Sequence, residues 1–230
     1  MTLKEVIKGT QKKKTENTAG FKNVFAHFVW KTISYFVTWP LVNTKVTPNQ
    51  VSFVSLLAPI IGTGIFMVAD TVPLKILAVV FFAIWAVLDD VDGGSARLKQ
   101  HFSKNGDLWD SAAGYVALSL MFVGMGFAAF DETDPNTVYY VVLGGLGGIL
   151  ALYPRLLMHF KYHGEDNVVN DKTSYGPIKL IVFNVISPDG FMIPFMFVGV
   201  IFGLEWFFTI GYTALYFLAC VYSTWLLFRE

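Results

Sequence analysis

Long hydrophobic stretches separated by short polar ones dominate the chain. Six of them approach the roughly 20 apolar residues that a helix needs to cross a bilayer, at about 51–69, 74–88, 112–130, 138–160, 191–204 and 206–228. The fifth is short, because a turn-forming Ser187-Pro188-Asp189-Gly190 segment separates it from the apolar residues before it. Residues 175–186 are then either interfacial or the opening of that span. The pattern predicts an all-α integral membrane protein with six transmembrane helices.

The segment before the first span is polar and then aromatic. Residues 21–40 alternate aromatic side chains with Lys22, His27 and Lys31 and end at Trp39-Pro40, which predicts an amphipathic helix along the membrane interface. The alternative is a frayed tail that only precedes the first span. We expect a polar, basic tail at 1–20, the interfacial helix at 21–40 and a six-helix membrane domain at 41–230.

Composition supports the membrane class. Hydrophobic residues make up 54% of the 230 residues and charged residues 15%, whereas about 25% charged is usual for soluble domains. So apolar a chain is a poor candidate for binding nucleic acid. The net charge is zero, yet every Lys and Arg except Lys75 falls on one predicted side of the membrane. By the positive-inside rule both termini should face the cytoplasm.

An acidic run ends the second apolar stretch, where charge near hydrocarbon is costly unless a partner, a metal or water compensates it. At about 100° per residue, one helix face gathers two carboxylates, two small residues and a neighbouring cation; these are Asp89, Asp92, Gly93, Ala96 and Arg97. One face of the next helix gathers Gly106, Asp110 and Gly114. This predicts a site at the cytoplasmic ends of two helices.

Carboxylate oxygens without clustered Cys or His select Mg²⁺, Mn²⁺ or Ca²⁺ over zinc. The small residues let a ligand lie against the helix, and Arg97 can meet a phosphate. Asp90 points about 100° away from Asp89 and is a solvated or outer residue rather than a ligand. The alternative is that these aspartates only cap a helix end in water.

The run Asp89-x-x-Asp92-Gly93-x-x-Ala96-Arg97, followed after eight residues by Gly106-x-x-x-Asp110, resembles the motif of the CDP-alcohol phosphotransferase (CDP-alcohol phosphatidyltransferase) family. The segment Thr47-Pro48-Asn49-Gln50-Val51-Ser52 resembles the Thr-Pro-Asn segment that those proteins often carry before their first span. The resemblance in layout extends over nearly the whole chain.

The resemblance implies a membrane transferase of phospholipid or related head-group synthesis. It would move a substituted phosphoryl group from a CDP-alcohol, either CDP-diacylglycerol or a CDP-head group, to a lipid or polar acceptor, and would release CMP. It implies Mg²⁺ or Mn²⁺ in a two-metal site held by Asp89, Asp92 and Asp110, and a homodimer. The residues lining the CDP site would be Asp89, Asp92, Gly93, Ala96, Arg97 and Gly106.

One position departs from the family pattern, which ends with a fourth Asp where this chain has Gly114. That Asp is thought to be the general base, and losing a base typically costs about 10²–10⁴-fold in rate. The chain is then inactive, or uses a neighbour, or takes an acceptor that is already ionised and so anionic. Asp107 is the nearest substitute, although a plain surface carboxylate is the stronger interpretation.

Two further functions stay open at this stage. One is a natural or engineered inactive member that binds nucleotide and metal without turnover. The other is a divalent cation transporter using intramembrane carboxylates, which leaves the spacing of Gly93, Ala96 and Arg97 unexplained. Arg155 lies at the predicted cytoplasmic end of the fourth span. It either binds a phosphate group, of the acceptor or of a lipid, or extends to the membrane surface as a snorkelling anchor.

Overall fold

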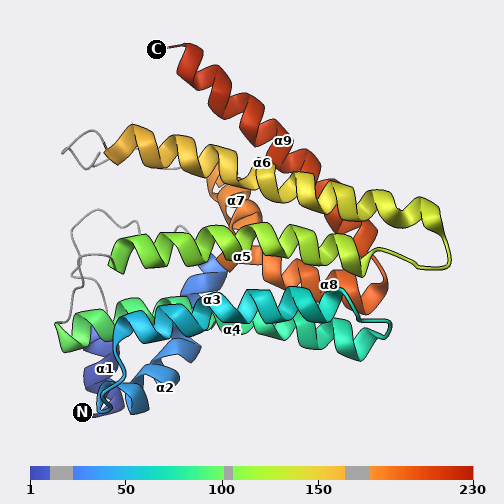
Figure 1. Ribbon diagram of the computed structural model, residues 1–230. Coiled ribbons are helices and arrows are strands. Elements are labelled where there is room, and N and C mark those ends of the chain that lie inside the picture. The colour runs from blue at the N-terminus through green and yellow to red at the C-terminus, as the bar shows by residue number, and fades with distance from the viewer. Residues whose placement is uncertain (11–22, 101–105, 164–176, 230) are drawn as a thin grey trace. The chain divides into compact units, whose positions relative to one another are not determined.

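The computed structural model describes residues 1–10, 23–100, 106–163 and 177–229, and every regular element in these ranges is a helix (Figure 1). The chain divides into two compact units. The first comprises Met1–Ile61, Val80–Ala117 and Gly176–Ile193, and the second comprises Gly62–Val79, Leu118–Tyr175 and Pro194–Glu230. Because the boundaries fall inside long helices, α3, α4 and α5 each contribute one end to each unit.

Five of the described helices are long and apolar enough to cross a membrane. They are α3 (Pro48–Phe66), α4 (Val72–Lys99), α5 (Gly106–Ala128), α6 (Val138–His163) and α9 (Glu205–Phe228). The predicted all-helical membrane class is confirmed. The predicted fifth span coincides with a shorter apolar helical segment, Pro188–Phe202, which is η4 (Pro188–Met192) followed by α8 (Ile193–Phe202). A total of six spans therefore stays a prediction.

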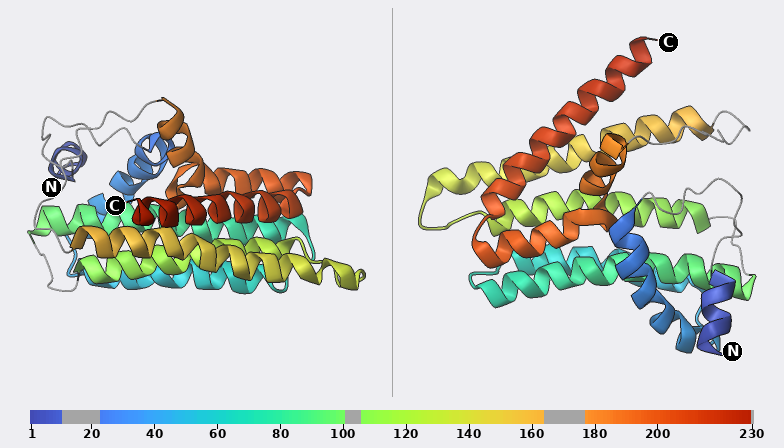
Figure 2. Two further views of the ribbon diagram at one scale, coloured as in Figure 1. Left: turned by 90° about the horizontal axis from the view of Figure 1, so that it is seen from above. Right: turned by 180° about the vertical axis from the view of Figure 1, so that it is seen from behind.

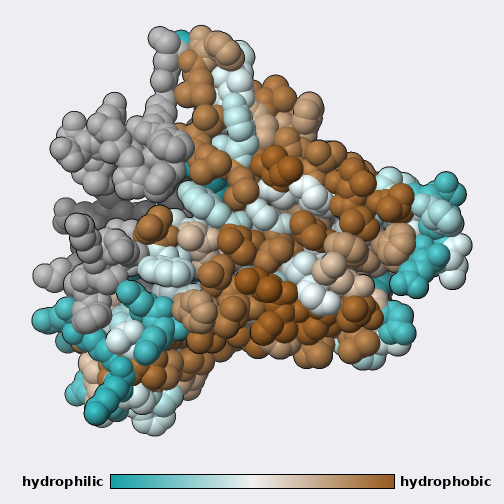
Figure 3. All heavy atoms as spheres, in the orientation of Figure 1, coloured by the Kyte–Doolittle hydropathy of each residue, from teal (hydrophilic) through white to brown (hydrophobic). Residues whose placement is uncertain are grey.

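Large apolar side chains lie on the outside of both units, as expected of helices in lipid. Phe53 and Val54 of α3 are more than half exposed in the first unit, as are Phe217 and Leu218 of α9 in the second. In Figure 3 hydrophobic side chains cover most of the visible long helices. Surface of this kind is stable only where hydrocarbon replaces water.

The first unit begins with α1 (Leu3–Thr10), η2 (Ala26–Trp30) and α2 (Lys31–Val42). The last two fall in the predicted interfacial helix, and α2 buries Ser34 and Thr38 while exposing Phe36 and Trp39. α1 packs closely on the end of α4, since a Cβ at Gly9 would collide with the side chain of Leu98. Of the predicted tail and helix, residues 11–22 lie outside the described residues.

Lys99 fastens the end of α4 to the connection between α2 and α3. Its Nζ donates hydrogen bonds to the carbonyl oxygens of Leu41, Thr44 and Val46 at 3.1, 3.0 and 2.6 Å. One ammonium thus satisfies three carbonyl groups at the end of α2 and in the following turn. The cation at this position is therefore structural.

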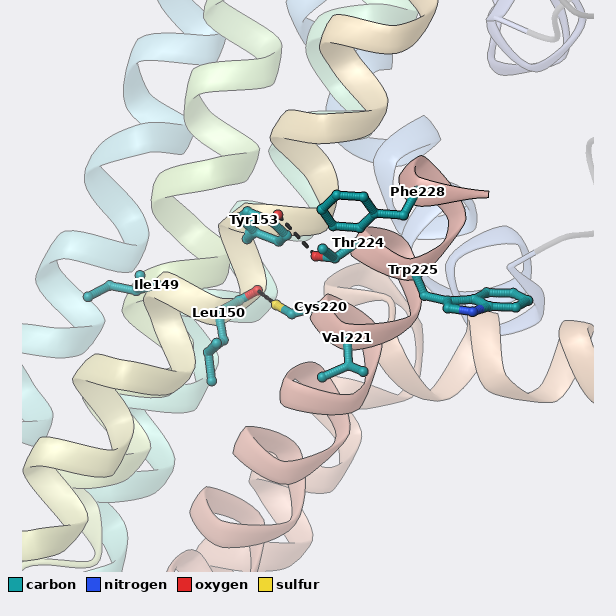
Figure 4. A pocket seen from close by; sticks show the side chains of 8 residues that line it. All are labelled: Ile149, Leu150, Tyr153, Cys220, Val221, Thr224, Trp225 and Phe228. Atoms are coloured by element: carbon teal, nitrogen blue, oxygen red, sulfur yellow. Dashed lines mark hydrogen bonds between the residues drawn. The ribbon is translucent and has the colours of Figure 1, made fainter. Parts of the chain in front are cut away.

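In the second unit, α6 and α9 pack along each other and diverge toward the end of α9 (Figures 1 and 2). Where they diverge, they line a groove of about 580 Å³ that is almost wholly apolar (Figure 4). Thr224 Oγ1 donates to Tyr153 Oη at 3.0 Å, and Cys220 Sγ donates to the Leu150 carbonyl oxygen at 3.1 Å. A groove with so few polar groups suits hydrocarbon and offers nothing to a phosphate.

Lys75, the cation that the sequence leaves alone on its side of the membrane, forms an ion pair. Its Nζ lies 3.0 Å from Glu205 Oε1 and donates to the Ala128 carbonyl oxygen at 2.6 Å. The Glu205 side chain is only 8% exposed and the Lys75 side chain 19%. The contact joins the starts of α4 and α9 within the second unit.

We expect Lys75→Met to lower the thermal unfolding midpoint in detergent. Removing one partner of a buried ion pair lowers the free energy of unfolding by about 3–5 kcal/mol. Because Lys75 is partly exposed, we expect a loss near the lower end of this range. Lys75→Met/Glu205→Gln should recover part of the loss, because no uncompensated charge then remains buried. Equal midpoints for the native protein and Lys75→Met would contradict this role.

Candidate functional site

The residues of the acidic motif all lie in the first unit. They occupy the second half of α4 and the start of α5, and these parts run beside the first-unit part of α3 in both Figures 1 and 2. α4 continues without a break through the acidic run to Lys99. Its polar end is held by α1 and by the bonds of Lys99, so two adjacent glycines do not terminate it.

Asp92 is the most buried of the motif carboxylates, at 5% exposure. Its Oδ2 accepts a hydrogen bond of 2.5 Å from Ser52 Oγ, near the start of α3. The carboxylate also has a hydrogen bond with the backbone of Gly93, so two partners fix its orientation. Ser52 closes the Thr47–Ser52 segment, which the sequence indicated without assigning this residue a role.

The carboxylates of the two helices converge. That of Asp89 lies within electrostatic range of those of Asp110, Asp92, Asp189 and Asp90, and Asp92 lies within range of Asp110. Asp89 is half-buried and Asp110 is exposed. The acidic side chains of α4 and α5 therefore influence one another electrostatically, and their joint role in holding a metal stays a prediction.

A converging set of like charges suits a divalent cation, since a cation turns mutual repulsion into attraction. Carboxylate oxygens are ligands that Mg²⁺ and Mn²⁺ accept. Among the described residues, no group of three or more Asp, Glu, His or Cys side chains lies so that it could hold a metal ion. The chemistry of the donors fits such an ion, but the positions of these carboxylates in the structure do not form a site for one.

Arg97 is oriented by the N-terminal helix. Its Nε donates a 2.9 Å hydrogen bond to the carbonyl oxygen of Thr10, the last residue of α1. A Cβ built on Gly93 would lie 3.4 Å from an Nη atom of Arg97, so the guanidinium group lies over the glycine. A Cβ on Gly94 would lie 3.2 Å from Thr10 Cγ2, so α1 also contacts this turn of α4.

Tyr35 of α2 adds a hydroxyl group beside this cation that the sequence did not indicate. Burial raises the pKa of Tyr35 and the charge of Asp90 raises it further, while a hydrogen bond with the Thr10 side chain and the charge of Arg97 oppose the rise. The phenol is therefore protonated at neutral pH. It can donate or accept a hydrogen bond beside the acidic run.

Gly114, where the resemblance leads us to expect a fourth Asp, faces open space. A Cβ at this position would meet no heavy atom within 4 Å. A Cβ there would therefore fit without moving a neighbour. The side chain of Asp107, the substitute considered from the sequence, lies outside the described residues.

The other predicted site residues are placed as follows. Ala96 on α4 and Gly106 at the start of α5 are half-buried in the first unit. Arg155 lies on α6 in the second unit, where it is half-buried. Its predicted part in binding a phosphate stays a prediction.

Asp189, read from the sequence only as a turn residue, belongs to this cluster. It lies in η4, which follows α7 (Pro177–Ile186), and its carboxylate lies within electrostatic range of Asp89. Trp30 Nε1 donates to its carbonyl oxygen at 2.8 Å. No local motif could have located it, because Trp30 and Asp189 are 159 positions apart in the chain.

These observations define a helical membrane protein with a carboxylate cluster, an oriented arginine and small residues at the ends of two adjacent helices. The family model for CDP-alcohol phosphatidyltransferase matches residues 45–221, and the chain belongs to that family. This confirms the resemblance seen in the motif. Members of the family are transferases that generally use Mg²⁺ or Mn²⁺. A search of curated proteins found no significant match to the chain.

Proposed function

We propose that this protein transfers a substituted phosphoryl group from a CDP-alcohol to an acceptor and releases CMP, in phospholipid or related head-group synthesis. The observation that supports this most is the convergence of Asp89, Asp92 and Asp110 within one unit of a chain of this family. Phosphoryl transfer depends mainly on positioning and on neutralising charge. A carboxylate cluster beside a fixed guanidinium group can serve both needs.

In this proposal Asp89, Asp92 and Asp110 hold the divalent ions, and Ser52 keeps Asp92 oriented toward them. Two such ions, when bound, neutralise the diphosphate and stabilise the departing CMP. Arg97, held by the Thr10 carbonyl group, contacts a phosphate oxygen of the donor. The absence of large side chains at Gly93, Ala96 and Gly106 leaves room for the nucleotide.

The reaction then needs one bond to form and one to break. An oxygen of the acceptor bonds to the phosphorus that carries the donor alcohol. The bond from that phosphorus to the oxygen of CMP breaks, and CMP leaves with the electron pair. Arg97 would hold the diphosphate so that these two oxygens lie on opposite sides of the phosphorus, and the carboxylates would hold the divalent ions that offset its charge.

We also propose that the site faces the cytoplasm and that the protein is a homodimer. The Lys and Arg residues around the motif helices support the orientation by the positive-inside rule. The donor is a soluble or lipid-linked nucleotide, which a basic membrane face attracts. The dimer follows from the family alone.

Metal-dependent CMP release by the purified protein in mixed micelles tests the proposal. CDP-diacylglycerol and CDP-head-group donors should be paired with neutral alcohols and with phosphate-bearing acceptors. We expect release with at least one pairing, loss of release in EDTA, and recovery with excess Mg²⁺ or Mn²⁺. Release in none of the pairings would refute the proposed transferase.

A second candidate function rests on Gly114, which lacks the carboxylate of the family pattern. The protein would then bind a CDP-alcohol and a divalent ion without turnover. Equilibrium binding of a labelled CDP-alcohol, measured beside the CMP assay, separates the two. Binding with no release favours the second candidate, and any acceptor-dependent release excludes it.

A further inference from the structure

We propose that α1 is part of the nucleotide site, and that the carbonyl group at its C-terminal end positions Arg97 for the diphosphate of a CDP-alcohol. This inference rests on the proposed function and adds to it a positioning element from the N-terminal segment. α1 ends at Thr10, whereas the family model matches the chain only from residue 45. Membership of the family therefore does not account for α1 or for its contact with the motif.

The sequence of α1 specifies where the helix begins. Thr2 and Glu5 form a capping box, in which the backbone N–H of Thr2 donates to Glu5 Oε2 at 2.8 Å and that of Glu5 donates to Thr2 Oγ1 at 3.4 Å. A helix of 8 residues is nevertheless too short to persist alone in water. α1 therefore depends on packing, and the residues that it buries are Val6 and Thr10, at 0% and 3% exposure.

Both ends of α1 are fixed to other helices of the first unit. Just before its start, the carbonyl oxygen of Met1 accepts a 3.0 Å hydrogen bond from Nε1 of Trp39 on α2. At its other end, a Cβ on Gly9 would collide with the side chain of Leu98 on α4. Leu98 directly follows Arg97 in the sequence. The last turn of α1 therefore lies against the turn of α4 that carries the motif arginine.

The C-terminal end of α1 offers a suitable partner for a cation. The last carbonyl groups of a helix have no partner within it and carry partial negative charge. Arg97 Nε donates to the Thr10 carbonyl oxygen at 2.9 Å, which uses one N–H group, and those of the Nη atoms can donate to phosphate oxygens. The guanidinium group lies over Gly93. α1 thus holds the cation on the motif helix before a nucleotide arrives.

Holding Arg97 in advance strengthens binding, because a flexible side chain loses rotamer freedom when it contacts a ligand. An arginine side chain has many rotamers, and the bond to Thr10 removes part of that freedom before the ligand binds. Undocking α1 should therefore weaken nucleotide binding about 3–10-fold, which is less than the loss expected for changing Arg97 itself. The loss should appear in donor binding rather than in kcat.

Val6→Asn tests this inference by placing an amide on the buried face of α1. We expect residues 3–10 to lose protection from hydrogen exchange. The probe for binding is labelled CDP with Mg²⁺, since CDP carries the cytidine and diphosphate common to every CDP-alcohol. Its Kd and the KM of the donor should both rise about 3–10-fold, with kcat nearly unchanged. Lys4→Asn introduces the same residue at an exposed position of α1 and should behave as the native chain.

The same two variants are also made in an Arg97→Gln background. If α1 acts through Arg97, Val6→Asn should weaken binding of CDP no further in that background. A general loss of folding would instead lower binding in both backgrounds. Should Val6→Asn leave residues 3–10 protected, a variant without residues 1–10 supplies the undocked state for the same measurements.

Equal or tighter binding of CDP by the undocked protein would overturn the inference and leave the proposed transferase standing. An equal loss in the native and Arg97→Gln backgrounds would overturn it as well, because α1 would then act on the fold and not through this arginine. A native chain that neither binds CDP nor releases CMP overturns the proposed function and this inference together.

Discussion

Asp92→Asn is expected to abolish metal-dependent CMP release, with a loss of activity of more than about 100-fold. Even the mutation of a residue that only hydrogen-bonds to a metal ligand typically lowers metal affinity or activity by about 10–100-fold. Asp92 is almost fully buried and accepts a hydrogen bond from Ser52. Asn would keep that bond through its carbonyl oxygen and would lose the negative charge. The fold should therefore persist while the capacity to hold a divalent ion falls. CMP release at saturating donor, measured over a range of Mn²⁺ concentrations, gives the result.

Asp90→Asn is the matched control for this change. Asp90 lies on the same helix two residues earlier, and the helical pattern directs it away from the face that carries Asp89 and Asp92. We expect its turnover to stay within a few-fold of the native value. Similar losses for Asp90→Asn and Asp92→Asn would contradict the assignment of the metal-binding face.

Arg97→Lys is expected to weaken use of the CDP-alcohol donor by about 10–100-fold in kcat/KM. Lysine carries one compact charge, whereas the guanidinium group offers a planar set of donors. The Arg97→Lys variant would lose the hydrogen bond from Nε to the Thr10 carbonyl oxygen. Without that bond, the positive charge would no longer be held over Gly93. The loss should appear mainly in the KM of the donor.

Arg229→Lys is the control for the arginine. Arg229 is exposed at the end of α9, with its guanidinium carbon 4.9 Å from the centre of the Trp225 ring. The same chemical change there should leave donor use unchanged. A native KM for the donor in Arg97→Lys would show that this guanidinium group does not bind the nucleotide.

The long helices were predictable because each of them is a continuous hydrophobic stretch. The motif face was predictable for a related reason: Asp89, Asp92 and Asp110 are placed by helical periodicity, which is local in sequence. Their convergence in the structure follows from two helices that are neighbours both in the chain and in space. The family match covers the part of the chain that contains these residues.

The contributions of Ser52 and Asp189 could not be predicted in this way. Ser52 reaches Asp92 over 40 residues of chain, and its position on α3 carries no sign of its partner. The Ser-Pro-Asp-Gly sequence around Asp189 is typical of a turn, which is a correct local description. Its proximity to Asp89 depends on where η4 packs, and side-chain packing between distant segments has no local sequence pattern.

The hydrogen bonds between the segment Asn23–Trp30 and the segment Asn184–Asp189 can form only after the second segment has been synthesised. They join residues 159 to 164 positions apart. At about 5–20 residues per second, the N-terminal segment is made roughly ten seconds or more before its partners leave the ribosome. During that time Phe25 lacks its contact with Phe191, and Trp30 lacks its hydrogen bond to the Asp189 carbonyl oxygen. Assembly of the site is thus a late event in insertion, and a chain stopped before residue 189 would carry the complete motif in an unfinished site.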